Sequence, residues 1–152
     1  MLWMTYVLGI VGLWVAGCLT QTMLAAVVVH VMLCVSDIDY VNAQSRASFC
    51  ESCTTWFRVE YVLSVAQVVI TWFSAPHWPL SLLLTAYVAY ETYISVTFPD
   101  RRTLDTVTIY RYKTSFVKET AIRVGVNVVL FLLYLFYVGA FTILYMDPTV
   151  KF

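Results

Sequence analysis

Two long apolar runs constrain this chain more than any other feature of its sequence. Met4–Val35 extends for 32 residues without an acid, a lysine or an arginine, and Val124–Met146 is also free of charge. About 20 helical residues cross the hydrocarbon core of a bilayer, so both runs are long enough to span it. Only 12% of the residues are charged, against roughly 25% in ordinary soluble domains. The sequence therefore predicts a membrane protein.

The first run could also be interpreted as a cleaved signal peptide. Against this, no basic segment precedes it, and it is much longer than the roughly 7–15 apolar residues of a signal sequence. A membrane-spanning helix is the better interpretation. At about 1.5 Å per residue this helix exceeds a hydrocarbon core of about 30 Å, so we expect it to tilt or to project beyond the lipid.

Two shorter apolar segments, Val59–Ala75 and Leu80–Phe98, are separated by a turn that contains Pro76 and Pro79. Their lengths are borderline for spans, and we predict that they form a tight hairpin in the membrane. The predicted fold class is an all-α membrane protein, a four-transmembrane-helix bundle in one domain of residues 1–152. The four spans are expected at about 4–35, 59–75, 80–98 and 124–146.

The basic residues predict the orientation of these spans. Lysines and arginines near span ends favour the cytosolic side of a membrane. Eight of the nine lie in the connections between spans one and two and between spans three and four: Arg46, Arg58, Arg101, Arg102, Arg111, Lys113, Lys118 and Arg123. We therefore expect both termini to lie outside the cell or in a lumen, and both charged connections to be cytosolic. The net charge of zero gives no indication of a nucleic-acid partner.

Acids and cysteines follow the first run. Asp37 and Asp39 are expected where the helix leaves the bilayer, since charge at its centre is costly. Cys50 and Cys53 form a C-x-x-C in a predicted cytosolic loop, where free or acylated thiols are expected. No second C-x-x-C completes the roughly four ligands of a zinc site. We expect no metal, no cofactor and no catalytic residue, with a thiol-redox enzyme using this cysteine pair as an alternative.

Polar residues inside the spans are candidates for function. Glu91 lies seven residues before Phe98, well inside its predicted span, and intramembrane carboxylates commonly mark functional sites. Three interpretations stay open for it: contact with a basic residue of a helix from another membrane protein, an internal pair with Arg123, or snorkelling to the cytosolic interface. Asn127 is expected to hydrogen-bond between helices or to recognise a helix of another membrane protein. The same holds for the polar groups of the first run, Thr20, Gln21, Thr22 and His30.

Two patterns predict how helices pack. Gly12 and Ala16 are small residues four apart, which favours close helix packing. Ile109, Tyr112 and Phe116 recur at helical spacing and predict an amphipathic cytosolic helix at the membrane surface before span four. The basic residues around them could only fix topology and contact anionic headgroups, at about 1 kcal/mol each, or they could bind a protein partner.

Three stretches resemble the cornichon family of tetraspan membrane proteins. The run that contains Asp37, Asp39, Tyr40 and Asn42 is similar to the family's Ser-Asp-Leu-Glu-x-Asp-Tyr-Ile-Asn, although it is two residues shorter. The stretch "LLLTAYVAYE", ending at Glu91, is similar to Leu-Leu-Asn-Leu-Pro-Val-x-Ala-Tyr-Asn, with glutamate in place of the final asparagine.

The third stretch, 104–125, aligns without gaps to the family's Leu-Asp-Ala-Thr-Glu-Ile-Phe-Arg-Thr-Leu region and the charged run that follows it. Ile109 and Arg111 match the family residues, and Tyr110 replaces phenylalanine. Tyr112 and Lys113 depart from the family's Thr-Leu. The resemblance extends over most of the chain, from about residue 29 to 145.

The resemblance implies a function. Cornichons act as cargo receptors that select transmembrane client proteins for export from the endoplasmic reticulum. Their Ile-Phe-Arg-Thr-Leu stretch is implicated in binding the cargo-selecting layer of the COPII coat, which implies a coat-binding role for Ile109, Tyr110 and Arg111. Some cornichons are auxiliary subunits of membrane channels or receptors, and this is the main alternative. The implied location is the membrane of the endoplasmic reticulum and of vesicles bound for the Golgi.

Overall fold

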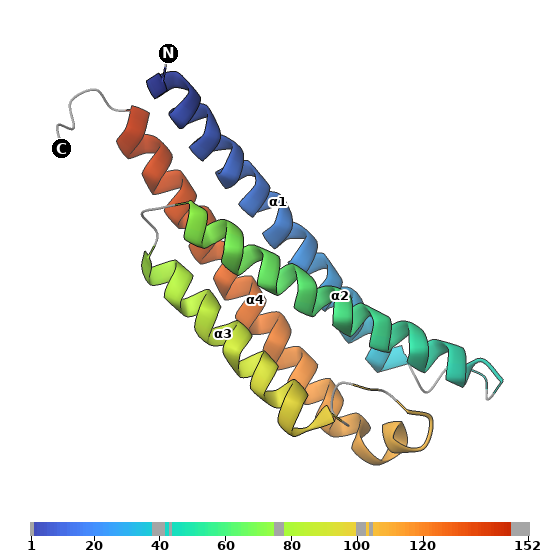
Figure 1. The fold of residues 1–152 in the computed structure, drawn as a ribbon. Coiled ribbons are helices and arrows are strands. Elements are labelled where there is room, and N and C mark those ends of the chain that lie inside the picture. Colours follow the sequence, from blue (N-terminus) through green and yellow to red (C-terminus); the bar gives the residue numbers. More distant parts are fainter. Residues whose placement is uncertain are drawn as a thin grey trace.

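The computed structural model describes residues 2–37, 42, 44–74, 78–99, 103 and 105–146. These residues form four α-helices and no strand, so the predicted all-α fold class is confirmed. The helices are α1 (Leu2–Ser36), α2 (Arg46–Phe73), α3 (Trp78–Thr97) and α4 (Thr108–Met146). Figure 1 shows them side by side, with the start of α1 and the end of α4 at the same end of the bundle.

Helix α1 packs against α2 and α4, whereas α3 packs mainly against α2 and makes fewer contacts with α4. The turn between α2 and α3 follows from the sequence. The Ser74 N–H and hydroxyl both donate to the Ile70 carbonyl at the end of α2. Pro79 is the second residue of α3, where proline is tolerated because the first turn needs no N–H partner.

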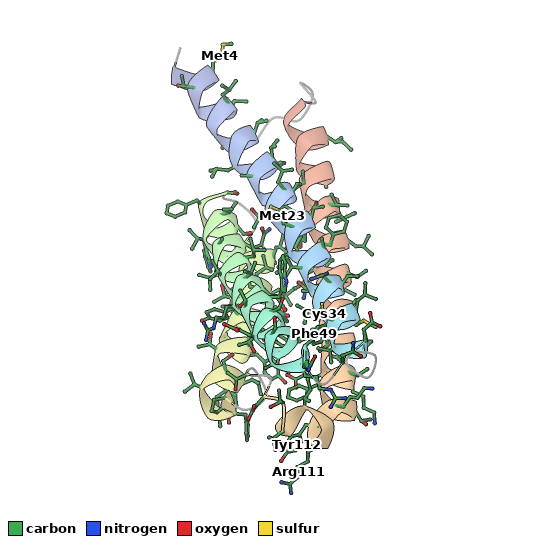
Figure 2. All side chains as sticks on the ribbon, turned by 90° about the vertical axis from the view of Figure 1, so that its right-hand side faces the viewer. Met4, Met23, Cys34, Phe49, Arg111 and Tyr112 are labelled. Atoms are coloured by element: carbon green, nitrogen blue, oxygen red, sulfur yellow. The ribbon has the colours of Figure 1, made fainter. Side chains whose placement is uncertain are left out.

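Helices α1 and α4 have the length and composition of membrane spans. Their apolar stretches, Val7–Ser36 and Arg111–Ala140, each cover 30 residues. Large apolar side chains such as Leu19, Ile122 and Leu132 point outward from these helices. Figure 2 shows such side chains projecting along the length of the bundle. An outer surface of this kind is suited to lipid, because soluble proteins rarely expose large continuous apolar patches.

Helix α2 begins at Arg46, well before the predicted span at Val59. The prediction of a loop around Cys50 and Cys53 is therefore wrong, since both lie buried in the first turns of α2. The reason is that this end of α2 has an apolar partner. Its cysteines and Phe57 pack against the C-terminal end of α1, and this contact stabilises the helix there.

A separate amphipathic helix before span four is also not found. Residues 108–146 form one continuous helix, α4, which starts with the Ile109 N–H donating to the Asp105 carbonyl. Ile109 and Phe116 lie in the core with Val31 and Phe57. Two of the three residues that suggested contact with the membrane surface are therefore covered by α1 and α2, and only Tyr112 of the three is exposed.

The interior of the bundle contains two apolar clusters with a polar layer between them. One cluster lies toward the starts of α2 and α4 and includes Val35, Cys53 and Ile109. The other joins α3 to the second half of α4 and includes Leu84 and Leu130. Between them lie these buried polar residues: Gln21, Glu60, Ser64, Gln67, Glu91, Thr120, Arg123 and Asn127.

Close helix packing occurs at Gly17 rather than at Gly12. A Cβ atom at Gly12 would meet nothing within 4 Å, whereas one at Gly17 would collide with the Tyr134 hydroxyl and lie 2.7 Å from its Cζ atom. The predicted packing position was therefore wrong. Because Tyr134 occupies the space beside Gly17, a larger residue at this position of α1 would collide with it.

Candidate functional site

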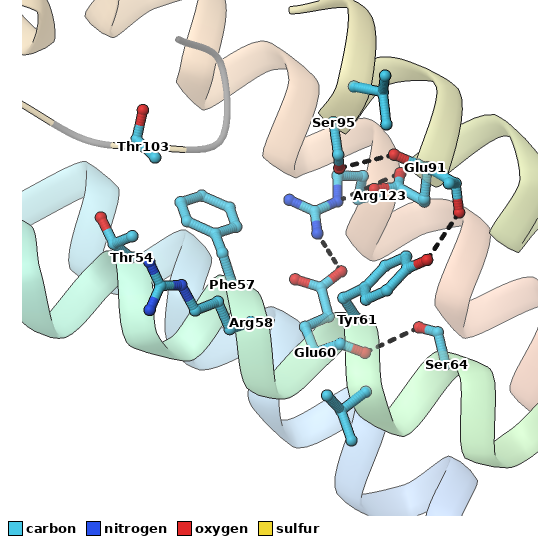
Figure 3. Close-up of a pocket in the computed structure, with 13 residues that line it drawn as sticks. Thr54, Phe57, Arg58, Glu60, Tyr61, Ser64, Glu91, Ser95, Thr103 and Arg123 are labelled. Carbon is cyan, nitrogen blue, oxygen red and sulfur yellow. Dashed lines mark hydrogen bonds and ion pairs between the residues drawn. The ribbon is translucent and has the colours of Figure 1, made fainter. Parts of the chain in front are cut away.

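Arg123 of α4 is the centre of the polar layer. Its guanidinium group forms an ion pair with Glu60 of α2, and its Nε atom lies 3.6 Å from Oε1 of Glu91 on α3. All three residues are buried, with at most 6% of each residue exposed. Figure 3 shows the guanidinium between the two carboxylates. Glu91 therefore adopts the internal pairing with Arg123 that was one of its three predicted interpretations.

Aromatic and amide groups complete this cluster. The Arg123 guanidinium carbon lies 5.2 Å from the centre of the Phe57 ring, within the range of a cation–π contact. Asn127 donates from Nδ2 to the Tyr87 hydroxyl at 3.1 Å and to the Arg123 carbonyl at 3.0 Å. The predicted interhelical hydrogen bond of Asn127 is thus confirmed, because Tyr87 belongs to α3. Since α3 packs mainly on α2, these polar contacts are an important part of its attachment to α4.

The polar groups of α1 behave differently. Thr20 and Thr22 donate to the Ala16 and Cys18 carbonyls of their own helix, each at 2.8 Å. The expectation of interhelical bonds is therefore wrong for these two hydroxyl groups. A threonine hydroxyl reaches the carbonyl one turn back without needing a second helix.

A cleft of about 550 Å³ lies beside the ionic cluster, between α2 and α3. The Tyr61 hydroxyl forms a hydrogen bond of 2.9 Å with Thr92 across these two helices. The cleft is lined by Thr54, Phe57, Arg58, Glu60, Tyr61, Val62, Ser64, Glu91, Thr92, Ser95, Val96, Thr103 and Arg123. Its volume is within the roughly 300–1,000 Å³ of typical ligand sites.

The residues predicted to bind a coat lie at the start of α4, away from this cleft. Ile109 is only 1% exposed and packs in the core, so its side chain holds the segment in place and presents little surface to a partner. Arg111 is exposed at the tip of the molecule, next to Tyr112 (Figure 2). The side chain of Tyr110 lies outside the described residues.

The structure describes only part of the predicted cytosolic end of helix one. Asp37 and Asn42 are exposed, while Asp39 and Tyr40 lie outside the described residues. None of the described residues of this run lines the cleft. Cleft and helix end are therefore separate candidate sites.

Sequence reasoning missed the role of Glu60 as a partner of Arg123. The spacing of polar residues along the sequence of α2 does indicate that Glu60 is buried. Glu60, Ser64, Gln67 and Thr71 recur every three or four residues on α2, and all are buried. This helix turns its polar stripe inward and Val62, Val69 and Phe73 outward. Such an inverted pattern is typical of a helix in lipid, where charged groups face the bundle interior.

The surroundings of Cys50 and Cys53 disfavour the thiolate form that thiol exchange requires. Burial, followed by the neighbouring Cys34 thiol, raises the pKa of Cys53 to about 12. Burial and the charge of Asp105 raise the pKa of Cys50. Thiol exchange requires the thiolate, and a raised pKa lowers the thiolate fraction at every pH near neutrality. The redox-enzyme alternative therefore finds no support in this geometry.

We expect Cys50 and Cys53 to react slowly with maleimide in the folded protein at about pH 8, at least about tenfold more slowly than an exposed thiol. The test uses a variant with Cys18→Ser and Cys34→Ser, so that only this pair is counted. The same variant unfolded in sodium dodecyl sulfate is the control and should label fully at both positions. Rapid labelling of the folded variant would revive the redox alternative.

The described residues form an all-helical bundle in which α1 and α4 are long and apolar enough to cross a membrane. A family model described as "Cornichon protein" matches residues 10–136. The chain therefore belongs to the cornichon family, as its sequence motifs indicated. Neither a curated protein nor a solved structure matches the chain.

Proposed function

We propose that this cornichon is a cargo receptor that selects transmembrane client proteins for export from the endoplasmic reticulum in COPII vesicles. The observation that carries the proposal is the family match over residues 10–136. A receptor of this kind performs no covalent chemistry. It must contact clients within the membrane and the coat in the cytosol, and the following features support each contact.

The client side is the outer surface of the bundle. In this proposal all four helices cross the membrane, with α2 and α3 inserted as a hairpin whose polar groups face inward. Outward apolar residues on these two helices, such as Val62, Phe73 and Val96, are consistent with insertion. A client helix would pack against such surfaces by van der Waals contact and interhelical hydrogen bonds.

The coat side is the start of α4. Arg111 is exposed there, and the buried Ile109 anchors the first turn to the core. Anchoring limits the conformational freedom that a partner would otherwise have to restrict, which favours binding. Each contact with the coat can be weak, because a coat lattice presents many sites and multivalency strengthens the overall attachment.

The membrane orientation in this proposal places both termini in the lumen of the endoplasmic reticulum. The positions of the basic residues support it. Arg46, Arg111 and Lys113 lie at the starts of α2 and α4, and lysine and arginine are enriched on the cytosolic side of membranes. The same end would then meet the coat.

A reconstituted budding assay from endoplasmic-reticulum membranes tests the coat contact. We expect Arg111→Glu combined with Tyr110→Ala to lower incorporation into vesicles by about tenfold, the effect of losing roughly 1.4 kcal/mol of binding. Ile109 is left unchanged, because truncation of this buried side chain would destabilise the fold. Lys118→Glu is the matched control, since Lys118 is also exposed on α4 but lies outside the motif.

Loss of packaging in the double variant, with normal packaging of the control, would support the receptor function. Unchanged packaging of the folded double variant would contradict the coat contact. The auxiliary-subunit alternative would then be preferred, because a subunit that stays with a channel uses the same helix surfaces without selecting a coat.

A further inference from the structure

The cleft between α2 and α3 has apolar walls and a charged floor. Val62 of α2 is 64% exposed and Val96 of α3 is 77% exposed, so both present apolar surface to whatever occupies the cleft. Beneath them lie Glu60, Glu91 and Arg123, which contact one another as ion pairs. A ligand for such a site needs an apolar part along the walls and a charged part at the floor.

The net charge of the cleft floor determines whether a cationic or an anionic ligand group is attracted. Among the described residues it contains two carboxylates and one guanidinium group, which leaves an excess of one negative charge. Both carboxylates already contact Arg123, so an incoming cation would share them. Arg58 also lines the cleft, but it is exposed and Figure 3 shows it directed away from Glu60, toward Thr54. Water and salt screen an exposed charge far more than a buried one.

A lysine or arginine side chain combines the two required properties. Its methylene stem covers apolar surface while its charged head reaches a polar group. An anionic group would meet two carboxylates at the floor and would be repelled. In a medium of low dielectric constant both the attraction and the repulsion are stronger than in water.

The position of the cleft suggests where such a side chain comes from. Thr54 and Thr103, which belong to the end of the bundle assigned to the cytosol, line the cleft together with Glu91, which lies within the helical hairpin. Transmembrane helices of most membrane proteins carry lysine or arginine close to their cytosolic ends. A client helix that packs against the walls would bring such a residue to the level of the floor.

We propose that this cleft binds a lysine or arginine side chain from the cytosolic end of a client's transmembrane helix. The assignment rests on the proposed receptor function and adds to it a chemical rule for client selection. Glu60 and Glu91 bind the cation, Arg123 holds the two carboxylates in position, and Val62 and Val96 pack on the side-chain stem.

The test uses two single-span reporter proteins with a leucine-rich helix of about 20 residues. They differ at one position, one turn inside the cytosolic end, which is lysine in one reporter and leucine in the other. The photocrosslinker benzoylphenylalanine replaces Val96 in the cleft wall. In a second protein it replaces Ile122, which is exposed on α4 outside the cleft and serves as the matched control.

From Val96 we expect about tenfold more crosslinking to the lysine reporter than to the leucine reporter, the size of one charge-assisted contact. From Ile122 the two reporters should crosslink equally. Glu91→Gln should remove the preference for lysine at Val96, and Arg123 keeps its pair with Glu60 in that variant. Val62→Trp, which fills the cleft without changing a charge, should remove it as well.

Equal crosslinking of the two reporters at Val96, or a lysine preference that survives Glu91→Gln, would overturn the inference. So would a crosslink from Val96 to phosphatidylethanolamine that does not depend on the reporter, since the cation would then come from a lipid. Export of the reporters is measured in the same cells. If both are exported equally, the receptor function stands and the cleft rule fails; if neither is exported or crosslinked at either position, the proposed function fails.

Discussion

Replacing Arg123 with methionine is expected to lower the free energy of unfolding by about 3–5 kcal/mol, the cost of breaking a buried ion pair. The substitution leaves Glu60 and Glu91 buried without the guanidinium group that both contact. It also removes the ionic contacts that join α4 to α2 and α3. The measurement is the thermal unfolding of the protein in detergent, followed by the loss of monodisperse protein.

Two further variants separate the loss of charge pairing from a general loss of packing. Arg58→Met removes an arginine that is exposed, and we expect a change of about 0.5 kcal/mol or less. The triple variant Arg123→Met, Glu60→Gln, Glu91→Gln should recover most of the lost stability, because neutral groups replace the whole buried cluster. If Arg123→Met alone is as stable as the parent, the ionic cluster does not hold these helices together.

Gly17→Ala is expected to destabilise the protein by about 1–3 kcal/mol, the usual effect of overpacking a core. The added Cβ would collide with the hydroxyl end of Tyr134, whose buried ring has little room to move. Helix α1 would then have to shift away from α4. The same thermal unfolding measurement applies.

Gly12→Ala is the matched control for this prediction. Its Cβ meets no atom within 4 Å, and alanine is favoured over glycine within a helix by roughly 0.5–1 kcal/mol, so this variant should be neutral or slightly more stable. Tyr134→Leu combined with Gly17→Ala should lose less stability than the two separate effects added together. Additive effects would show that the two residues do not contact each other.

The number and the positions of the helices were largely predictable from the sequence. Runs such as Met4–Val35 and Val124–Met146 are long, apolar and uninterrupted, and no other regular structure satisfies their backbone groups in lipid. The prolines between the two shorter segments predicted the turn. The start of α2 was placed too late because its cysteine-containing first turns are not apolar enough to indicate a span, and the helix forms there through contact with α1.

The candidate site was predictable only in part. Glu91 and Arg123 were recognised as possible partners because Glu91 is a charge inside one apolar segment and Arg123 directly precedes another, and a buried charge requires compensation. Glu60 was not placed with them. The pattern along α2 shows an inward polar stripe, but it does not say which residues of other helices face that stripe. For the same reason the sequence indicated Gly12 rather than Gly17 as the packing position.

By itself the sequence determined that this chain is a helical membrane protein of the cornichon family, because span length, low charge and local motifs are properties of continuous segments. Only the tertiary structure decided that Ile109 is buried, that one arginine holds two carboxylates from two other helices, and that a cleft lies beside them. The physical reason is that helical periodicity defines which residues share a face. Which faces meet depends on how side chains from distant segments fit together in three dimensions.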